Sequence, residues 1–257
     1  MKKLLIFGGT SEGRRLLQAL ASYPVAVTLC VAGAYGHALL PVESEKLKIC
    51  VGRLNAEQMA ALTRRGNFSC IVDATHPYAA AVSVNIKEAA AATQVPYLRL
   101  LRKKSDTGAG IIVPSLRAAA ELIGELQGMA LITTGSKELT VFTKIPGFKE
   151  RLYLRVLPAV ESIRACLALG FPARHLIAMQ GPFSRELNKA LLQQFNIRIL
   201  VTKDSGLAGG FPAKKEAARE LGVQLIVLRR PQEAGLSYRE TVAKILELLG
   251  VDTCLSI

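Results

Sequence analysis

The sequence predicts an α/β fold made of two Rossmann-like lobes with parallel sheets and a ligand cleft between the lobes. Short apolar runs alternate with longer amphipathic runs along the chain, a pattern typical of strands that alternate with helices. Most of the apolar runs are continuous and rich in β-branched residues, as strands buried on both faces are. A polar, turn-like stretch after residue 100 then divides the expected strands into two groups.

Eleven runs have the character of buried strands. In chain order they are Lys3–Phe7, Val25–Val31, Leu47–Val51, Cys70–Asp73, Tyr97–Leu101, Ile111–Val113, Ala130–Thr133, Leu152–Val156, His175–Ala178, Arg198–Val201 and Gln224–Leu228.

Helices fit between these strands, and two of them carry capping-box patterns. Asn55 with Gln58 predicts one helix start, and Gly66 predicts its end. Ser237 with Glu240 predicts the start of the last helix. Further helix signals are the Ala-rich runs Ala79–Thr93 and Ala213–Leu221, and the closing glycines Gly222 and Gly250.

Eleven strands are many for one doubly wound sheet. Because the segment Arg102–Gly108 is polar and turn-like, we place a boundary there. The sequence thus predicts an N-terminal Rossmann-like lobe over residues 1–104 and a C-terminal α/β lobe over residues 105–257. The final helix can pack on either lobe.

The composition is that of a globular protein, with half of the 257 residues hydrophobic and about a fifth charged. The apolar run Leu4–Phe7 near the N-terminus stops at two glycines and is too short for a secretory signal. No stretch approaches the roughly 18 apolar residues that a membrane span needs. We therefore expect a soluble, cytoplasmic protein that does not bind membranes.

The cysteines and histidines show no metal-ligand spacing and no CxxC pair. We expect reduced, buried thiols and no metal site. The residues are Cys30, Cys50, Cys70, Cys166, Cys254, His37, His76 and His175.

The net charge of +13 predicts an anionic partner. Nucleic acid is disfavoured because the basic residues are scattered, Trp is absent, and no zinc-finger, basic-zipper or RNA-binding aromatic motif occurs. A small substrate with several carboxylates or phosphates explains the charge equally well.

Ligands of open parallel sheets bind outside the carboxyl ends of the strands. Glycines, hydroxyls and charges gather at these ends, which makes one rim of each lobe the expected functional edge. The segments concerned are Gly8–Arg14 and Asp73–Tyr78 in the first lobe, and Thr133–Lys137, Gln180–Ser184 and Thr202–Gly206 in the second.

The first rim segment suits a phosphate, because a strand, a glycine turn and a helix start present free amides and a positive dipole end. It is not a P-loop, since no Gly-Lys-Ser/Thr follows. It is also an imperfect GxGxxG: Gly8 and Gly13 match the outer positions, Thr10 replaces the middle glycine, and Glu12 adds a negative charge. A dinucleotide, another phosphate ligand and a purely structural turn all remain open.

The acidic residue that usually binds the cofactor ribose is missing after the second strand, at Ala32–Gly36. Arg53, after the third strand, is a candidate for a 2′-phosphate, so the choice between NADPH and NADH stays open. The residues expected to bind the cofactor are Gly8, Gly9, Thr10, Ser11, Glu12, Gly13, Arg14, Arg53, Thr75 and Tyr78.

Charged residues elsewhere on the rims have two interpretations each. His76 either contacts a ligand or caps local backbone, and a helix N-terminus beside it would favour its neutral form. Arg99 and Arg102 either bind substrate carboxylates or belong to a solvated charge run. Lys203 and Asp204 either serve the site or form a structural ion pair.

Taken as an ordered set, these motifs resemble the precorrin-6A reductases of cobalamin biosynthesis. The resemblance covers nearly the whole chain, and although each motif is short, their order is specific. The motifs are Phe7–Arg14, Val51–Leu54, Asp73–Ala79, Pro96–Arg102, Thr134–Lys137, Gln180–Ser184 and Thr202–Gly206.

The resemblance implies an enzyme that transfers hydride from NADPH or NADH to one double bond of a ring-contracted tetrapyrrole, giving precorrin-6B or its cobalt form. The segment Ala32–Gly36 lacks the arginine associated with the aerobic branch, which favours the anaerobic substrate, cobalt-precorrin-6A. A tetrapyrrole with acetate and propionate arms also fits the positive charge. The oligomeric state stays open.

In this interpretation the proton donor is His76, Lys137 or Asp204, and the remaining rim residues bind the substrate. The latter are Arg99, Arg102, Thr134, Gly135, Ser136, Gln180, Gly181, Pro182, Lys203, Ser205 and Gly206. The alternatives are a dinucleotide-dependent oxidoreductase of another small polyanion and a nucleotide-sensing regulator. A short-chain reductase is disfavoured because no tyrosine is followed by lysine four residues on.

Overall fold

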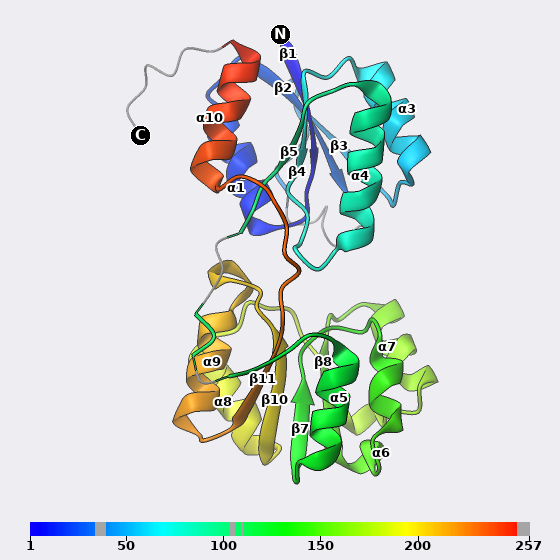
Figure 1. The fold of residues 1–257 in the computed structure, drawn as a ribbon, viewed down its shortest axis with the longest axis vertical. Helices are drawn as coiled ribbons and strands as arrows, with labels where there is room; N and C mark the ends of the chain where they lie inside the picture. Colours follow the sequence, from blue (N-terminus) through cyan, green and yellow to red (C-terminus); the bar gives the residue numbers. More distant parts are fainter. Residues whose placement is uncertain (34–39, 103–105, 109, 251–257) are drawn as a thin grey trace. The chain divides into compact units, whose positions relative to one another are not determined.

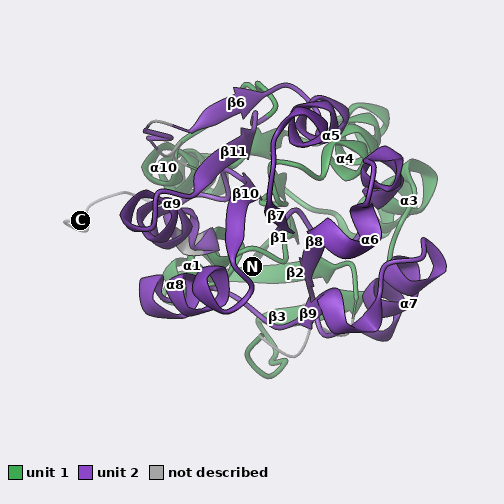
Figure 2. Cartoon of the chain, turned by 90° about the horizontal axis from the view of Figure 1, so that it is seen from below, with its two compact units in different colours: residues 1–103, 231–257 green, residues 104–230 purple. Residues whose placement is uncertain are grey.

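The chain forms two compact units, which are described separately. The structure, a computed structural model, describes residues 1–33, 40–102, 106–108 and 110–250. Unit 1 comprises residues 1–103 and 231–257, and unit 2 comprises residues 104–230 (Figure 2).

Unit 1 is built on a five-stranded parallel sheet in the order β3-β2-β1-β4-β5. The central strands consist of apolar residues buried on both faces, as helix-covered parallel strands require. The strands are β1 (Lys2–Phe7), β2 (Val25–Val31), β3 (Leu47–Val51), β4 (Cys70–Asp73) and β5 (Tyr97–Arg99).

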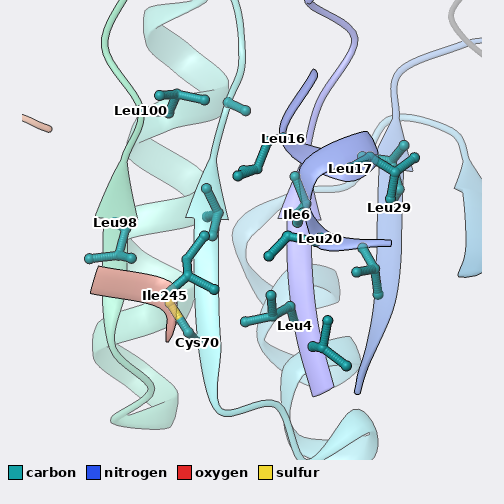
Figure 3. Packing of buried hydrophobic residues seen from close by; sticks show 14 of the residues in the cluster. Leu4, Ile6, Leu16, Leu17, Leu20, Leu29, Cys70, Leu98, Leu100 and Ile245 are labelled. Carbon is teal, nitrogen blue, oxygen red and sulfur yellow. The ribbon is translucent and has the colours of Figure 1, made fainter. Parts of the chain in front are cut away.

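Helices cover both faces of this sheet (Figure 1). Helices α1 (Ser11–Leu20) and α10 (Tyr238–Leu249) pack on one face, where Leu16, Leu20 and Ile245 meet Leu4 and Ile6 (Figure 3). Helices α3 (Ala56–Gly66) and α4 (Ala80–Thr93) pack on the other face through residues such as Met59 and Ile86.

Unit 2 holds a six-stranded parallel sheet in the order β6-β11-β10-β7-β8-β9. The strands are β6 (Ile111–Val113), β7 (Met129–Ile132), β8 (Leu152–Val156), β9 (Leu176–Ala178), β10 (Ile197–Lys203) and β11 (Gln224–Leu228).

Two layers of helices enclose this second sheet (Figures 1 and 2). Helices α8 (Arg185–Gln194) and α9 (Phe211–Glu220) cover one face, and their apolar residues join those of β7, β10 and β11 in one cluster. Elsewhere lie α5 (Leu116–Glu125), α6 (Phe148–Arg151), α7 (Val160–Ala168) and the short 3₁₀ turns η1 (Leu139–Lys144), η2 (Ala173–His175) and η3 (Leu207–Gly209).

The predicted α/β class with two parallel sheets is confirmed, and each predicted strand is present with shifts of a few residues at its ends. The capping boxes at Asn55 and Ser237 form as expected. The predicted second lobe, residues 105–257, differs from unit 2 at its C-terminal end. The reason is that α10 buries Ile245 and Leu249 against the sheet of unit 1.

The returning segment also bonds directly to unit 1. The amide of Leu236 donates to the carbonyl of Arg99 over 2.8 Å, and the amide of Leu101 donates to the carbonyl of Leu236 over 2.7 Å. Gly235 is required at this crossing, because a Cβ there would lie 2.6 Å from the Arg99 carbonyl oxygen. Among the described residues, no helix is both long and apolar enough to cross a lipid bilayer.

His175 is a buried histidine of unit 2 whose protonation is expected to oppose folding. Its ring is buried, stacks on Tyr153 at 4.2 Å between centroids, and has an Nδ1 atom without a hydrogen-bond partner among the described residues. Burial, and then the charge of Arg174, lower its pKa below the usual value of about 6.5. The native state therefore favours neutral His175, so its contribution to stability is complete above about pH 6.5 and falls as the pH drops further.

We predict that the free energy of unfolding falls less between pH 7.5 and pH 5.5 in His175→Phe than in the natural protein, because the variant keeps the ring stack but has nothing to protonate there. Urea denaturation at the two pH values measures this. Equal losses in the two proteins would show that His175 is not a source of the acid sensitivity.

Candidate functional site

The rim of unit 1 opens where its strand order reverses. From β1 the chain continues to one side through β2 and β3, and β4 and β5 lie on the other side. Open parallel sheets bind ligands at such a switch point, outside the carboxyl ends of the strands. The turns after β1 and β4 meet here, because the Thr10 hydroxyl donates to the Ala74 carbonyl over 2.8 Å.

Three glycines shape the turn after β1. A Cβ on Gly8 would lie 2.8 Å from Leu29, and a Cβ on Gly13 would contact Ala74 at 3.4 Å, so both permit close packing against the sheet. Gly9 has φ of +114°, which disfavours a side chain, yet a Cβ there would meet no atom within 4 Å. The turn therefore leaves open space at Gly9.

Thr10 begins helix α1 instead of lining that space. Its hydroxyl accepts a hydrogen bond from the Gly13 amide over 3.1 Å while it donates to Ala74, and the residue is buried. This double role explains why the chain has threonine where the dinucleotide fingerprint has its middle glycine. The Thr10 hydroxyl is thus engaged in capping and in joining the two turns, and the predicted place of Thr10 in a cofactor-binding turn stays a prediction.

The free amides and the open space suit a phosphate. The amides of Gly9 and Ser11 have no hydrogen-bond partner among the described residues, and they lie at the positive end of a ten-residue helix. No Cβ fills the space over Gly9. These features fit the pyrophosphate of a dinucleotide.

Glu12 is the apparent exception at this anion site, and Arg102 accounts for it. The Arg102 guanidinium forms an ion pair with the Glu12 carboxylate and lies 3.4 Å from the Ser11 hydroxyl. Burial alone would raise the pKa of Glu12, but Arg102, the backbone amide of Glu12 and the Ser11 hydroxyl together lower it. Glu12 is thus ionised and neutralised, so it does not leave a bare negative charge beside the turn.

A buried ion network underlies the end of β4. Asp73, with no exposed surface, accepts a hydrogen bond from Arg99 over 2.8 Å, and Arg99 also pairs with Glu233 over 2.7 Å. Thr75 and Tyr97 donate to the same Asp73 carboxylate over 2.7 and 3.0 Å. Burial, and then Asp73, raise the pKa of Tyr97, so its hydroxyl keeps its proton.

This network engages two residues that the sequence predicts to bind ligands. Arg99 is buried, and its guanidinium is engaged by Asp73, Glu233 and the backbone and hydroxyl of Thr75; its predicted binding of substrate carboxylates stays a prediction. The Thr75 side chain is likewise engaged by Asp73 and Arg99, and its predicted binding of the cofactor stays a prediction. Both residues hold the rim in shape.

His76 and Tyr78 occupy the turn between β4 and α4. Nδ1 of His76 accepts from the Tyr78 amide over 3.3 Å, and the two rings lie 5.6 Å apart. This bond places the proton of a neutral imidazole on Nε2. Both residues are half-buried.

The remaining predicted cofactor ligands are more exposed. Arg53 is exposed after the end of β3, and Arg14 is half-buried in the first turn of α1. The segment Ala32–Gly36, where the sequence lacks the usual ribose-binding acid, is only partly described, because residues 34–36 lie outside the described residues.

Unit 2 has a comparable switch point between β7 and β10. After β7, the Thr134 hydroxyl is buried without a hydrogen-bond partner among the described residues, and Gly135 has φ of +90° with open space around it. The Ser136 hydroxyl bonds that of Ser162 over 3.2 Å, and Lys137 is exposed.

The segment after β10 is largely occupied by its own contacts. Asp204 is buried, accepts from the Gly206 amide over 3.1 Å and pairs with Arg230 over 3.4 Å. The Ser205 hydroxyl donates to the Gly209 carbonyl over 2.8 Å. The Asp204 carboxylate is therefore engaged by Arg230 and by the Gly206 amide, and its predicted catalytic role stays a prediction.

Lys203 and the segment Gln180–Pro182 are more accessible parts of this rim. Lys203 is half-buried. Burial is the main cause that lowers its pKa; the charge of Glu138 opposes this shift, and the charge of Lys137 adds to it. Gln180 and Pro182 are exposed, and Gly181 is half-buried beside the Phe183 ring.

Sequence reasoning missed four charged residues that the structure makes prominent. Glu233 and Arg230 complete the ion pairs with Arg99 and Asp204. Arg155 and Lys214 are buried cations in unit 2. Only Arg155 had a sequence signal, since it interrupts an otherwise apolar strand.

Together the two sheets and their polar carboxyl-end rims define a two-unit, Rossmann-like α/β protein with a phosphate-suited turn in unit 1. Within the described residues, no cluster of three or more His, Cys, Asp or Glu side chains is arranged to hold a metal.

Comparison with known proteins identifies the family. The family described as "Precorrin-6x reductase CbiJ/CobK" matches residues 3–250. The cobalt-precorrin-6A reductase of Priestia megaterium is 37% identical over 242 residues, covering 91% of this chain and 93% of its own. That of Salmonella typhimurium is 35% identical over 233 residues, covering 89% and 87%.

A solved structure agrees. The protein titled "CobK precorrin-6A reductase" aligns with a TM-score of 0.78 and 26% identity over 98% of this chain and 99% of that one. The chain belongs to the precorrin-6x reductase family and is an oxidoreductase. The resemblance inferred from the motifs is confirmed.

The buried network makes a direct prediction about stability. Arg99→Met should lower the free energy of unfolding by about 3–5 kcal/mol, because it leaves the buried Asp73 carboxylate without its cation. Urea denaturation measures the change. Arg65→Met, at an exposed position, should change it by less than about 0.5 kcal/mol. A loss below about 1 kcal/mol for Arg99→Met would contradict the role assigned to the network.

Proposed function

We propose that this chain reduces cobalt-precorrin-6A with hydride from NADPH or NADH, giving cobalt-precorrin-6B. Family membership supports the precorrin-6A reductase reaction as a whole. The cobalt form is favoured because the relatives from Priestia, Methanothermobacter and Salmonella, at 34–37% identity, are named cobalt-precorrin-6A reductases, as are those from Synechocystis and Methanocaldococcus at 30–31%. Relatives named precorrin-6A reductase are 30–32% identical.

The observation that carries the cofactor proposal is the open, amide-lined turn at Gly9. Gly8–Gly13 would hold the pyrophosphate, with Arg14 and Tyr78 nearby on the same rim. Arg53 would face a 2′-phosphate if the cofactor is NADPH. The nicotinamide ring, when bound, supplies the hydride, and the protein supplies binding and orientation.

The proposed roles of the remaining rim residues follow from their environments. His76, with its proton on Nε2, and Lys137, exposed on unit 2, are the proposed proton donors. Arg102 keeps Glu12 neutralised while the phosphates bind. Thr134, Gly135, Ser136, Gln180, Gly181, Pro182, Lys203, Ser205 and Gly206 are proposed to form the substrate-binding rim of unit 2.

A variant at Gly9 tests the proposal. Gly9→Asp should weaken NADPH and NADH binding about a hundredfold relative to Gly9→Ala, because both variants carry the same backbone strain but only one places a carboxylate against the pyrophosphate. Fluorescence titration measures the two affinities. In turnover assays, the natural protein should oxidise the cofactor with cobalt-precorrin-6A faster than with metal-free precorrin-6A.

Three outcomes would count against the proposal. Equal affinity of the Gly9→Asp and Gly9→Ala proteins for both cofactors would remove the phosphate from this turn. Faster turnover of metal-free precorrin-6A would overturn the cobalt assignment. Absence of cofactor oxidation with either tetrapyrrole would overturn the reaction itself.

A further inference from the structure

Unit 2 contains two buried cations that none of the roles above uses. Arg155 on β8 is 5% exposed and Lys214 on α9 is 8% exposed. Burial, and then the charge of Arg155, lower the pKa of Lys214 to about 7, and burial lowers that of Arg155 to about 10. Both lie beside Phe183: its ring is 4.2 Å from the Arg155 guanidinium carbon, and a Cβ on Gly210, one helical turn before Lys214, would lie 3.6 Å from the Phe183 amide nitrogen.

These two cations differ in their ion pairing from other largely buried cations of this chain. Arg99, Arg102 and Arg230 each pair with a carboxylate, from Asp73 and Glu233, from Glu12 and from Asp204 respectively. Arg155 and Lys214 form no ion pair within the described residues. Burying cations without a counter-charge is unfavourable, and the lowered pKa of Lys214 reflects that cost; an anion bound beside the two side chains would supply the counter-charge and favour the charged form of Lys214.

The neighbours of the two cations are neutral hydrogen-bonding groups. Lys214 donates from Nζ to the Thr202 hydroxyl over 3.2 Å, and Arg155 donates from Nη1 to the Asn188 amide oxygen over 2.9 Å. The Phe183 ring lies 4.2 Å from the Arg155 guanidinium carbon. These contacts orient both cations but leave them most of their donors, since an ammonium has three and a guanidinium five.

Arg155 and Lys214 lie near the carboxyl-end rim of the unit 2 sheet. Arg155 and Thr202 each precede the last residue of their strand, β8 and β10, at the carboxyl end of the sheet. Phe183 belongs to the segment Gln180–Ser184, which is part of the proposed substrate rim, and a Cβ on Gly210 would lie 3.3 Å from Pro182. The starts of α8 and α9 meet here, and their dipoles also favour a negative charge.

We propose that Lys214 and Arg155 form an oxyanion site that receives a carboxylate arm of the tetrapyrrole substrate. This inference rests on the proposed function for the identity of the ligand, although the site itself is argued from the buried charges. A carboxylate matches the forked donors of a guanidinium and would supply the missing counter-charge. The other source of an oxyanion is a phosphate of the dinucleotide, and the test distinguishes the two.

The first experiment uses a small carboxylate and does not depend on enzyme activity. Thermal unfolding of the full chain at pH 7 is compared in sodium propionate and in sodium chloride at equal ionic strength. Propionate should raise the midpoint of the natural protein by about 2–4 °C relative to chloride. Lys214→Met should abolish this difference, and in chloride it should be at least as stable as the natural protein, because it removes a buried cation.

Lys215→Met is the matched control, since Lys215 is the next residue of the same helix and pairs with the exposed Asp106. It should respond to propionate as the natural protein does. Lys214→Gln, which keeps a neutral donor, serves as the second variant if Lys214→Met does not fold. An equal propionate effect with and without the Lys214 ammonium would overturn the site.

The second experiment identifies the source of the anion. Lys214→Met should raise the KM for cobalt-precorrin-6A about ten- to a hundredfold, as loss of a charge-assisted hydrogen bond does, and leave NADPH affinity within about twofold. Weaker NADPH binding with an unchanged KM would overturn the assignment to a substrate arm. If the natural protein shows the propionate effect but does not turn over cobalt-precorrin-6A, the site stands and the proposed function fails.

Discussion

The contact between Arg99 and Asp73 is the interaction on which the architecture of unit 1 depends. Asp73 ends β4 at the switch point of the sheet, and Arg99 ends the neighbouring β5, so their ion pair fixes two strand ends in the interior. Glu233 joins the pair from the returning segment that leads to α10. One guanidinium thus links the rim of the site to the helix that closes the core, although the residues lie 134 positions apart in the chain.

The same electrostatic requirement explains the rest of the rims. A parallel sheet brings polar strand ends together, and each buried charge there needs a partner. Arg102 meets that need for Glu12, and Arg230 meets it for Asp204. Arg155 and Lys214 are the contrasting pair within the described residues, which is why we assign their counter-charge to the substrate. In this proposal, the paired cations stabilise the fold, whereas Arg155 and Lys214 bind the substrate.

The sequence predicted the strands, the two sheets and the glycine turn because these depend on local patterns: continuous apolar runs, capping boxes and glycine spacing. It did not predict which charges pair. Arg99 and Asp204 stand at strand ends, where site residues are expected. Arg99 nevertheless pairs with Glu233, 134 positions away, and Asp204 pairs with Arg230, which follows the neighbouring strand β11. Lys214 gave no signal, since a lysine in a helix is ordinarily exposed and its burial depends on how α9 packs on β10.

We propose above that the turn over Gly9 holds a hydride donor for a tetrapyrrole. The most direct measurement follows the hydride itself: cobalt-precorrin-6A is incubated anaerobically with NADPH or NADH carrying deuterium at both C4 positions of the nicotinamide, and the product is analysed by mass spectrometry. The account predicts one deuterium in each molecule of cobalt-precorrin-6B. A reduced product without the label, or no reduction with either cofactor, would contradict it.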